Sequence, residues 1–277
     1  MSFEIISPLY KWNKHYSLAK IRAIEARRKY EIKNGPVAEP VFNYLEKENC
    51  IVITFDMGKK TSVTGMYVKK GDTKLILIHK NRVLGQQYFT AAHELSHVLY
   101  DEGDMLDICL PQTYRKDEKE TLADFFAAHF LMPEEDIISE FSSEYPPKVS
   151  KETIVYLSSK YKVTFIAMAL RLYALGLISQ EEYERYHTQS NKGKVGAKEI
   201  CIKLGIDYSN IAPTNEIYVS PAYFDLLISV YHKANISRTV LKDHFLRYLE
   251  DKLKADFSHI LKMADETYPD EVGWDDI

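Results

Sequence analysis

The chain has 277 residues, 45% of them hydrophobic and 27% charged, which is enough apolar material for one full core and a smaller one. Its net charge of −4 argues against a broad phosphate-binding surface, so direct binding of nucleic acid is not expected. Its apolar runs are too short to span a bilayer, and no signal-peptide core opens the chain, so no membrane association is expected. The scattered cysteines form no CxxC pair, which favours a cytoplasmic protein in which Cys50, Cys109 and Cys201 are small buried residues.

The N-terminal part is expected to be helical before it changes to strands. A charged helix is predicted over residues 17–33, and Asn34-Gly35-Pro36 ends it. A second helix is predicted over residues 37–48. Runs of β-branched and aromatic residues then predict three strands, with Lys70-Gly71-Asp72 as the hairpin turn between the last two. The strands cover residues 50–55, 62–68 and 73–79.

Residues 86–101 are predicted to form the helix on which the chemistry depends. Apolar residues recur in it at helical spacing, and no glycine or proline interrupts it. It contains His93-Glu94-Leu95-Ser96-His97, and a helix places residues four apart on one face, so both imidazoles point to one place. Each can give zinc one nitrogen, while Glu94 can reach a water at the open position of the metal. We therefore predict His93 and His97 as zinc ligands and Glu94 as the catalytic base.

A third ligand must come from elsewhere, because two histidines do not hold a catalytic zinc. The metzincin pattern needs glycine at position 100 and histidine at position 103, whereas the chain has Tyr100 and Gly103. A carboxylate from a second helix remains. That helix is predicted over residues 117–132, which begin acidic, turn apolar and end before Pro133.

Glu120 is the candidate ligand in this second helix, because small residues on the same stripe allow close packing against the histidine helix. The stripe consists of Glu120, Ala123, Asp124, Ala127 and Leu131. Glu118 stays open as an alternative ligand, although it lies about 160° from Glu120 around the helix axis. His129 lies about 180° from Glu120 and is expected to be a hydrogen-bonded structural histidine that faces away from the metal.

Both segments resemble the signature of the ImmA/IrrE metallopeptidases, which pairs Phe-Thr-x-Ala-His-Glu-x-x-His with Glu-x-x-Ala-(Asn or Asp)-x-Phe-Ala-x-x-x-(Leu)-Met-Pro. The chain reads Phe89-Thr90-Ala91-Ala92-His93-Glu94-Leu95-Ser96-His97 in the first half. In the second half it reads Glu120-Thr121-Leu122-Ala123-Asp124-Phe125-Phe126-Ala127, running to Leu131-Met132-Pro133. The resemblance covers roughly residues 20–187.

This resemblance implies that His93, His97 and Glu120 bind zinc and that Glu94 is the base. It also implies a dedicated protease whose partner is a protein substrate, often a helix-turn-helix repressor of a mobile element or stress response. Asp124 takes a position that the family usually gives to asparagine. Ser96 stands where the family often has glycine, and its hydroxyl can bond back to the carbonyl four residues earlier.

Peptide binding is expected at an edge of the small sheet, because zinc peptidases commonly pair an extended substrate with an exposed strand. The strand over residues 74–79 is the candidate edge, and an ordinary interior strand is the equally open alternative. The donor that stabilises the oxyanion is left open among four residues. They are His79, Tyr88, Tyr100 and Tyr114.

After Pro133 the chain is predicted to be helical, with three helices spaced as in a helix-turn-helix. They cover residues 151–160, 163–175 and 179–186. The second of them offers little beyond Arg171 to meet base edges, so a packing module is expected rather than a DNA reader. A polar linker is predicted over residues 187–196.

Beyond the linker, residues 197–277 are expected to form a mostly helical accessory region that serves recognition or control. It contains amphipathic helices over residues 221–233 and 237–254 and an acidic tail over residues 265–277. Residues 1–190 are expected to form the metallopeptidase domain, with residues 151–187 as its closing module.

The expected fold is α+β, with a zincin-like metallopeptidase core of a small sheet, an active-site helix and a ligand helix, followed by helical modules. The expected function is that of a zinc-dependent endopeptidase that cleaves a specific intracellular protein, with a transcriptional repressor as its partner. Two alternatives stay open. One is a non-catalytic regulator stabilised by zinc, and the other is a DNA-binding transcription factor.

Overall fold

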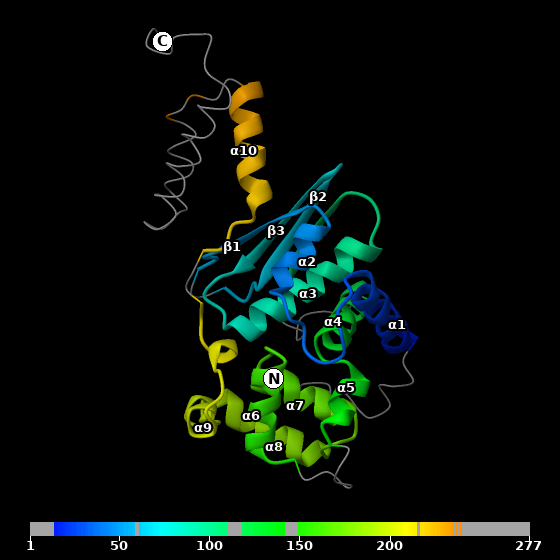
Figure 1. The fold of residues 1–277 in the computed structure, drawn as a ribbon, viewed down its shortest axis with the longest axis vertical. Helices are drawn as coiled ribbons and strands as arrows, with labels where there is room; N and C mark the ends of the chain where they lie inside the picture. The colour runs from blue at the N-terminus through cyan, green and yellow to red at the C-terminus, as the bar shows by residue number, and fades with distance from the viewer. Residues whose placement is uncertain are drawn as a thin grey trace. The chain divides into compact units, whose positions relative to one another are not determined.

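The computed structural model describes residues 14–58, 61–109, 118–141, 149–214, 217–234, 237 and 239. The chain divides into two compact units, Met1–Tyr218 and Val219–Ile277, and each is described here by itself. The first unit contains a sheet, a set of helices against it and a helical module (Figure 1). This is the mixed α+β architecture expected from the sequence.

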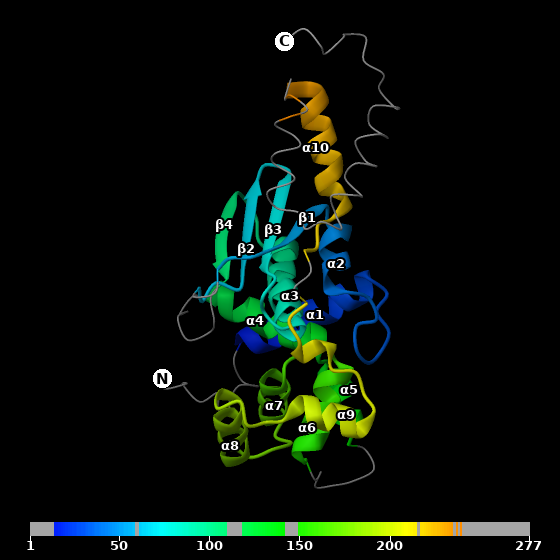
Figure 2. The same ribbon diagram turned by 90° about the vertical axis from the view of Figure 1, so that its left-hand side faces the viewer.

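The sheet has four strands in the order β1-β3-β2-β4, which Figure 2 shows side by side. They are β1 (Cys50–Phe55), β2 (Gly65–Lys70), β3 (Thr73–His79) and β4 (Met105–Cys109). β1 runs parallel to β3, whereas β2 is antiparallel to both β3 and β4. The hairpin between β2 and β3 turns at Gly71, whose φ of 56° is a left-handed conformation that glycine adopts without strain.

The prediction of β3 as the edge strand is wrong, because β3 pairs with β1 on one side and β2 on the other. The edge on the far side of β2 is β4, a strand that sequence reasoning missed. β4 is only five residues long and follows Gly103 closely, so its alternating pattern was too short to stand out. Burial along β4 alternates between exposed residues, Leu106 and Ile108, and more buried ones, Met105, Asp107 and Cys109.

Five helices pack with the sheet or with each other in the first part of the chain. They are α1 (Lys14–Lys29), α2 (Val41–Lys47), α3 (Leu84–Tyr100), α4 (Glu118–Leu131) and α5 (Glu134–Ser139). α2 begins later than predicted because Pro40 stands at its N-cap. α1 packs on α4, and α4 packs on α3. Buried alanines at helical spacing on α1, namely Ala19, Ala23 and Ala26, allow its close approach.

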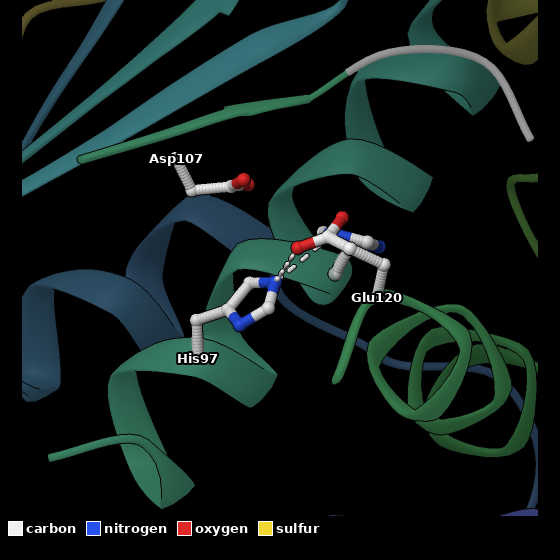
Figure 3. Close-up of side chains that lie close together, drawn as sticks. His97, Asp107 and Glu120 are labelled. Atoms are coloured by element: carbon white, nitrogen blue, oxygen red, sulfur yellow. Dashed lines mark hydrogen bonds and ion pairs between the residues drawn. The ribbon is translucent and has the colours of Figure 1, made fainter. Parts of the chain in front are cut away.

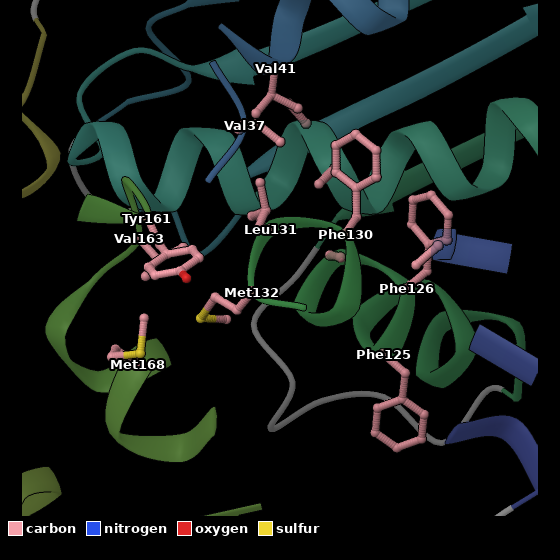
Figure 4. Packing of buried hydrophobic residues seen from close by; sticks show 14 of the residues in the cluster. Val37, Val41, Phe125, Phe126, Phe130, Leu131, Met132, Tyr161, Val163 and Met168 are labelled. Atoms are coloured by element: carbon pink, nitrogen blue, oxygen red, sulfur yellow. The ribbon is translucent and has the colours of Figure 1, made fainter. Parts of the chain in front are cut away.

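Large buried aromatic residues of the hydrophobic core lie on one side of α4. Phe126 and Phe130 are fully buried and stack with their ring centroids 5.6 Å apart, and Tyr44 of α2 packs edge-on against Phe130. Figure 4 shows Phe125 pointing the opposite way from these two rings. α4 is therefore apolar on two sides, one towards the sheet and its helices and one towards the helical module.

The helical module contains α6 (Lys151–Lys160), α7 (Phe165–Ala174), α8 (Gln180–Asn191) and α9 (Ala197–Leu204). Ser150, Thr164 and Ser179 cap the first three, each accepting a bond from the backbone N–H three residues on. At α8 the cap is a full capping box with Glu182. The three predicted helices are thus present, and α8 ends five residues later than predicted.

The stretch predicted as a linker lies inside the first unit. Its first half is the end of α8, the rest is a short turn, and α9 packs on α6. The chain then returns to the start of α3 and to the helical module, where the backbone N–H of Leu84 donates to the Ala212 carbonyl and the Asn210 amide donates to the Val163 carbonyl. Compact packing therefore continues to Tyr218, well past the predicted boundary at residues 190–197.

In the second unit the structure describes α10 (Pro221–Ala234), which matches the helix predicted over residues 221–233. The helix predicted over residues 237–254 lies outside the described residues apart from residues 237 and 239, and the acidic tail lies wholly outside them. Within the part of the chain that the structure describes, no helix combines the length and apolar character that crossing a bilayer requires.

Candidate metal centre

α3 places two histidines and a glutamate in the interior between the sheet and α4. His93, Glu94 and His97 are all almost completely buried. The two histidines lie one turn apart, and their Nε2 atoms are 3.2 Å from each other. Both imidazoles thus direct the same nitrogen to one place, as the spacing predicts.

Glu120 brings a carboxylate from the first turn of α4 to the same place (Figure 3). Its two carboxylate oxygens lie 3.3 Å from the Nε2 atoms of His93 and His97. Zinc bonds of about 2.0–2.1 Å at tetrahedral angles put neighbouring donor atoms about 3.3 Å apart. The spacing of the three donor groups therefore fits a single tetrahedral metal ion.

Two further carboxylates hold the imidazole rings in their orientation and tautomer. Nδ1 of His93 donates to Asp124 at 2.9 Å, and Nδ1 of His97 donates to Asp101 at 3.0 Å. With the proton held on Nδ1, the lone pair of each Nε2 is available to a metal ion. Asp101 directly follows α3, four residues after His97. Sequence reasoning overlooked it, although this spacing was the available signal.

The charges around the cluster favour a cation. Burial alone lowers the pKa of His93, but the charges of Cys109 and Asp124 and the hydrogen bond to Asp124 outweigh it and raise this pKa to about 10. The hydrogen bond from His97 in turn lowers the pKa of Asp101. The place that His93 faces therefore stabilises positive charge, which a proton or a metal ion can supply.

The two other candidates in α4 lie away from this cluster. Glu118 has a mostly exposed side chain whose oxygens lie 3.8 Å from Lys14 Nζ and 3.7 Å from His15 Nε2. His129 is buried and accepts a hydrogen bond at 3.0 Å from Arg171 through Nδ1. The structure therefore brings Glu120, and not Glu118, to the histidines, and it gives His129 the structural environment that its helical position predicts.

Asp107 on β4 is a fourth potential donor that sequence reasoning missed. It can place a carboxylate oxygen within 4.8 Å of donor atoms from His93, His97 and Glu120. Figure 3 shows its carboxyl group directed across the site towards Glu120 and His97. Its Oδ2 is buried and has no hydrogen-bond partner among the described residues. Only the pairing of β4 with β2 brings Asp107 here, so no local pattern pointed to it.

Two further residues border Glu94. Cys109 on β4 is buried, as predicted, and its sulfur lies within 4.8 Å of donor atoms of His93 and Glu94. A Cβ added at Gly65 on β2 would lie 2.5 Å from Thr90 Cγ2 and 3.5 Å from Glu94 Oε1. The absence of a side chain at Gly65 thus allows the strand to pass close over the glutamate.

The candidates for the oxyanion donor stay open. Tyr100 donates its hydroxyl to the Arg22 carbonyl of α1 at 2.8 Å, and Tyr88 packs edge-on against Phe42 of α2. His79 is buried at the end of β3 and does not join the donor cluster of the described residues. Tyr114 lies outside the described residues.

The small sheet, the active-site helix with His-Glu-x-x-His and the ligand helix with Glu120 define a zincin-like metallopeptidase core. Residues 45–173 match the family model of the IrrE N-terminal-like domain, peptidase M78, of the ImmA/IrrE family. The match is shorter at both ends than the resemblance read from the sequence and covers under half of the chain. A comparison with curated proteins finds no match.

Proposed function

We propose that the chain is a zinc-dependent endopeptidase that cleaves a specific intracellular protein. The observation that carries this proposal is the tetrahedral spacing of two imidazole nitrogens and one carboxylate, with Glu94 beside them. Two nitrogens and one carboxylate oxygen form a donor set known from catalytic zinc sites, which keep one further position open. The match of residues 45–173 to a peptidase family model supports the same function.

In this proposal His93, His97 and Glu120 hold the zinc, while Asp124 and Asp101 keep the two imidazoles in the required orientation and tautomer. A bound zinc ion supplies a Lewis acid that polarises a peptide carbonyl and lowers the pKa of water at the site. Glu94 accepts a proton from the attacking water and returns it to the leaving amine.

The substrate is proposed to bind as an extended strand along β4. β4 is an edge of the sheet, and it carries Asp107 and Cys109 towards the donor cluster, so a peptide paired with it passes close to the metal. β3, the strand first expected in this role, has a partner on each side and cannot take another. A helix-turn-helix repressor is the proposed partner, as the resemblance to the ImmA/IrrE metallopeptidases implies, and the cytoplasm is the proposed location.

The test is to incubate the purified chain with candidate helix-turn-helix repressors, with zinc and with a chelator. Cleavage is expected only with zinc. Glu94→Gln should retain zinc and lose cleavage by about 10²–10⁴-fold, because an amide keeps the shape of the side chain but cannot accept the proton. His97→Ala should lose both. Cleavage by Glu94→Gln at the original rate would remove Glu94 from its role.

Asp107 favours a second candidate function, that of a regulator in which zinc is structural. Structural zinc sites fill all four positions with protein ligands, and Asp107 lies within reach of the fourth. Asp107→Asn separates the two functions. If Asp107 is a permanent ligand, the variant should lose zinc affinity; if the site is catalytic, zinc affinity should stay close to that of the original chain.

A further inference from the structure

A cavity of about 840 Å³ opens beside the donor cluster, within the first unit. Its walls come mainly from α3, α4, α7, α8, the turn before α9 and the first turn of α9. At one end it is bounded by His93, Cys109 and Asp124, and from there it extends along the helical module. A volume of this order falls in the range of roughly 300–1,000 Å³ found for binding sites that enclose most of a ligand.

The walls that α4 and α7 contribute are mainly apolar. α7 is hydrophobic nearly all round, and its two sides have different surroundings. Met168 and Leu172 are fully buried in the core of the module, whereas Ile166, Ala167 and Leu170 are half-buried and line the cavity. α4 contributes the side that points away from its stacked phenylalanines, with Phe125, Ala128 and Met132 (Figure 4).

The two charged groups that α4 and α7 contribute to the walls, Asp124 and Arg171, are hydrogen-bonded within the protein. The guanidinium of Arg171 donates to the Met132 carbonyl at 2.9 Å, to the Tyr16 hydroxyl at 3.1 Å and to His129 at 3.0 Å. Asp124 accepts the bond from His93. Along α4 and α7 an occupant therefore meets mainly aromatic and aliphatic side chains, with His93 and Asp124 beside the donor cluster. On the side of α8 and α9 the lining also includes His187, Lys198 and Glu199.

We propose that this cavity binds apolar side chains of the protein substrate on one side of the scissile bond. This inference rests on the proposed peptidase function. The cavity reaches His93, so its occupant lies next to the bond that is cut, and its volume exceeds the space for one side chain. The substrate class is thus an extended segment rich in leucine, isoleucine and phenylalanine. Such a segment is normally buried in a folded protein, so cleavage requires its prior exposure.

Two labelled peptides of equal length test the proposal directly. They share one central bond and differ only in the residues beside it, which are leucine and phenylalanine in one and serine and asparagine in the other. Fluorescence anisotropy measures their binding to the full, zinc-loaded Glu94→Gln chain, in which cleavage does not interfere. The apolar peptide should bind at least about tenfold more tightly, the effect of small changes of apolar size in a hydrophobic pocket.

Variants of the wall locate the binding. Ala167→Phe fills the cavity, and Leu170→Gln makes its wall polar without adding bulk. Each should weaken binding of the apolar peptide about tenfold and leave the polar peptide unchanged. Ala38→Phe is the matched control, because Ala38 is exposed and lies outside the cavity. Circular dichroism and zinc content establish that each variant is folded, and the peptide comparison holds even if one wall variant is not.

Equal affinity for the two peptides would overturn the proposal, as would unchanged binding in folded wall variants. Binding of a small apolar dye that the wall variants abolish, without any peptide binding, would instead assign the cavity to a small molecule. The proposed function fails separately. A chain that binds the apolar peptide through the cavity but never cleaves it keeps the cavity proposal and loses the peptidase. Equal cleavage of both peptides keeps the peptidase function and removes the cavity proposal.

Discussion

His93 and His129 are both buried histidines, yet their surroundings give them opposite protonation behaviour. His93 lies between α3 and α4, where neighbouring negative groups outweigh burial and raise its pKa to about 10. His129 lies between α4 and α7, where burial and the charge of Arg171 lower its pKa to about 2. The comparison teaches that burial does not decide the role of a histidine here, whereas the charge placed beside it does.

The direction of the hydrogen bonds follows the same division. Nδ1 of His93 donates to Asp124, so Nε2 is the nitrogen that takes up either a proton or a metal ion. Nδ1 of His129 accepts from Arg171, which requires the neutral ring, because a protonated imidazole has no lone pair to offer. α4 thus contributes to a cation-binding site on one side and to the packing of a buried arginine on another.

Removing the Glu120 carboxylate should lower zinc affinity more than removing a carboxylate that supports one of the histidines. Glu120→Ala should weaken zinc binding by more than about 100-fold, since loss of a ligand costs more than the 10–100-fold typical of a supporting residue. Glu118→Ala is the matched control and should leave affinity unchanged, because its ion pairs are with α1 residues. Competition with a chromophoric chelator measures both. The reverse result would transfer the ligand role to Glu118.

Removing the Asp124 carboxylate, which accepts the hydrogen bond from His93, should lower zinc affinity by a smaller factor. Asp124→Ala should weaken zinc affinity about 10–100-fold, because the imidazole loses the group that holds its orientation and tautomer. Asp124→Asn should fall between this variant and the original chain, since an amide oxygen can still accept the N–H although the negative charge is gone. The same chelator competition ranks the three proteins. Equal affinity of all three would show that Asp124 does not support the site.

The structural histidine should affect stability through pH. The folded pKa of His129 is lowered to about 2, so below the unfolded value of about 6.5 only the unfolded chain takes up this proton. The contribution of neutral His129 to the free energy of unfolding is therefore complete above a pH of about 6.5. Below that pH the contribution is lost by up to about 1.4 kcal/mol per pH unit.

Urea unfolding of the original chain and of His129→Gln between pH 5 and pH 8, with chelator present, measures this contribution. The glutamine oxygen can accept from Arg171 but cannot titrate, so the stability advantage of the original chain should shrink as pH falls. His93 titrates in both proteins and cancels in the difference. A pH-independent difference would show that His129 takes up a proton in the folded state.

Much of the fold could be predicted because the residue periodicity within a segment indicates whether that segment is a helix or a strand. β1 and β3 lie at the predicted residues, and the helices around the metal cluster and in the helical module differ from prediction mainly at their ends. The ends differ where a cap or a proline decides them, as Pro40 does for α2. β4 was missed because five residues carry too little pattern to identify a strand that long-range pairing creates.

The sequence by itself determined that His93, Glu94 and His97 share one turn of a helix and that Glu120 stands on the stripe of α4 that packs towards them, because helical geometry relates residues three or four apart. Only the tertiary structure decided what surrounds them. The positions of Asp107 and Cys109, the closeness of Gly65 to Glu94 and the apolar cavity all arise from contacts between distant segments. The return of residues 205–214 to the core arises in the same way. Such contacts depend on how whole elements pack, and the residue periodicity within one helix or strand does not show which other element packs against it.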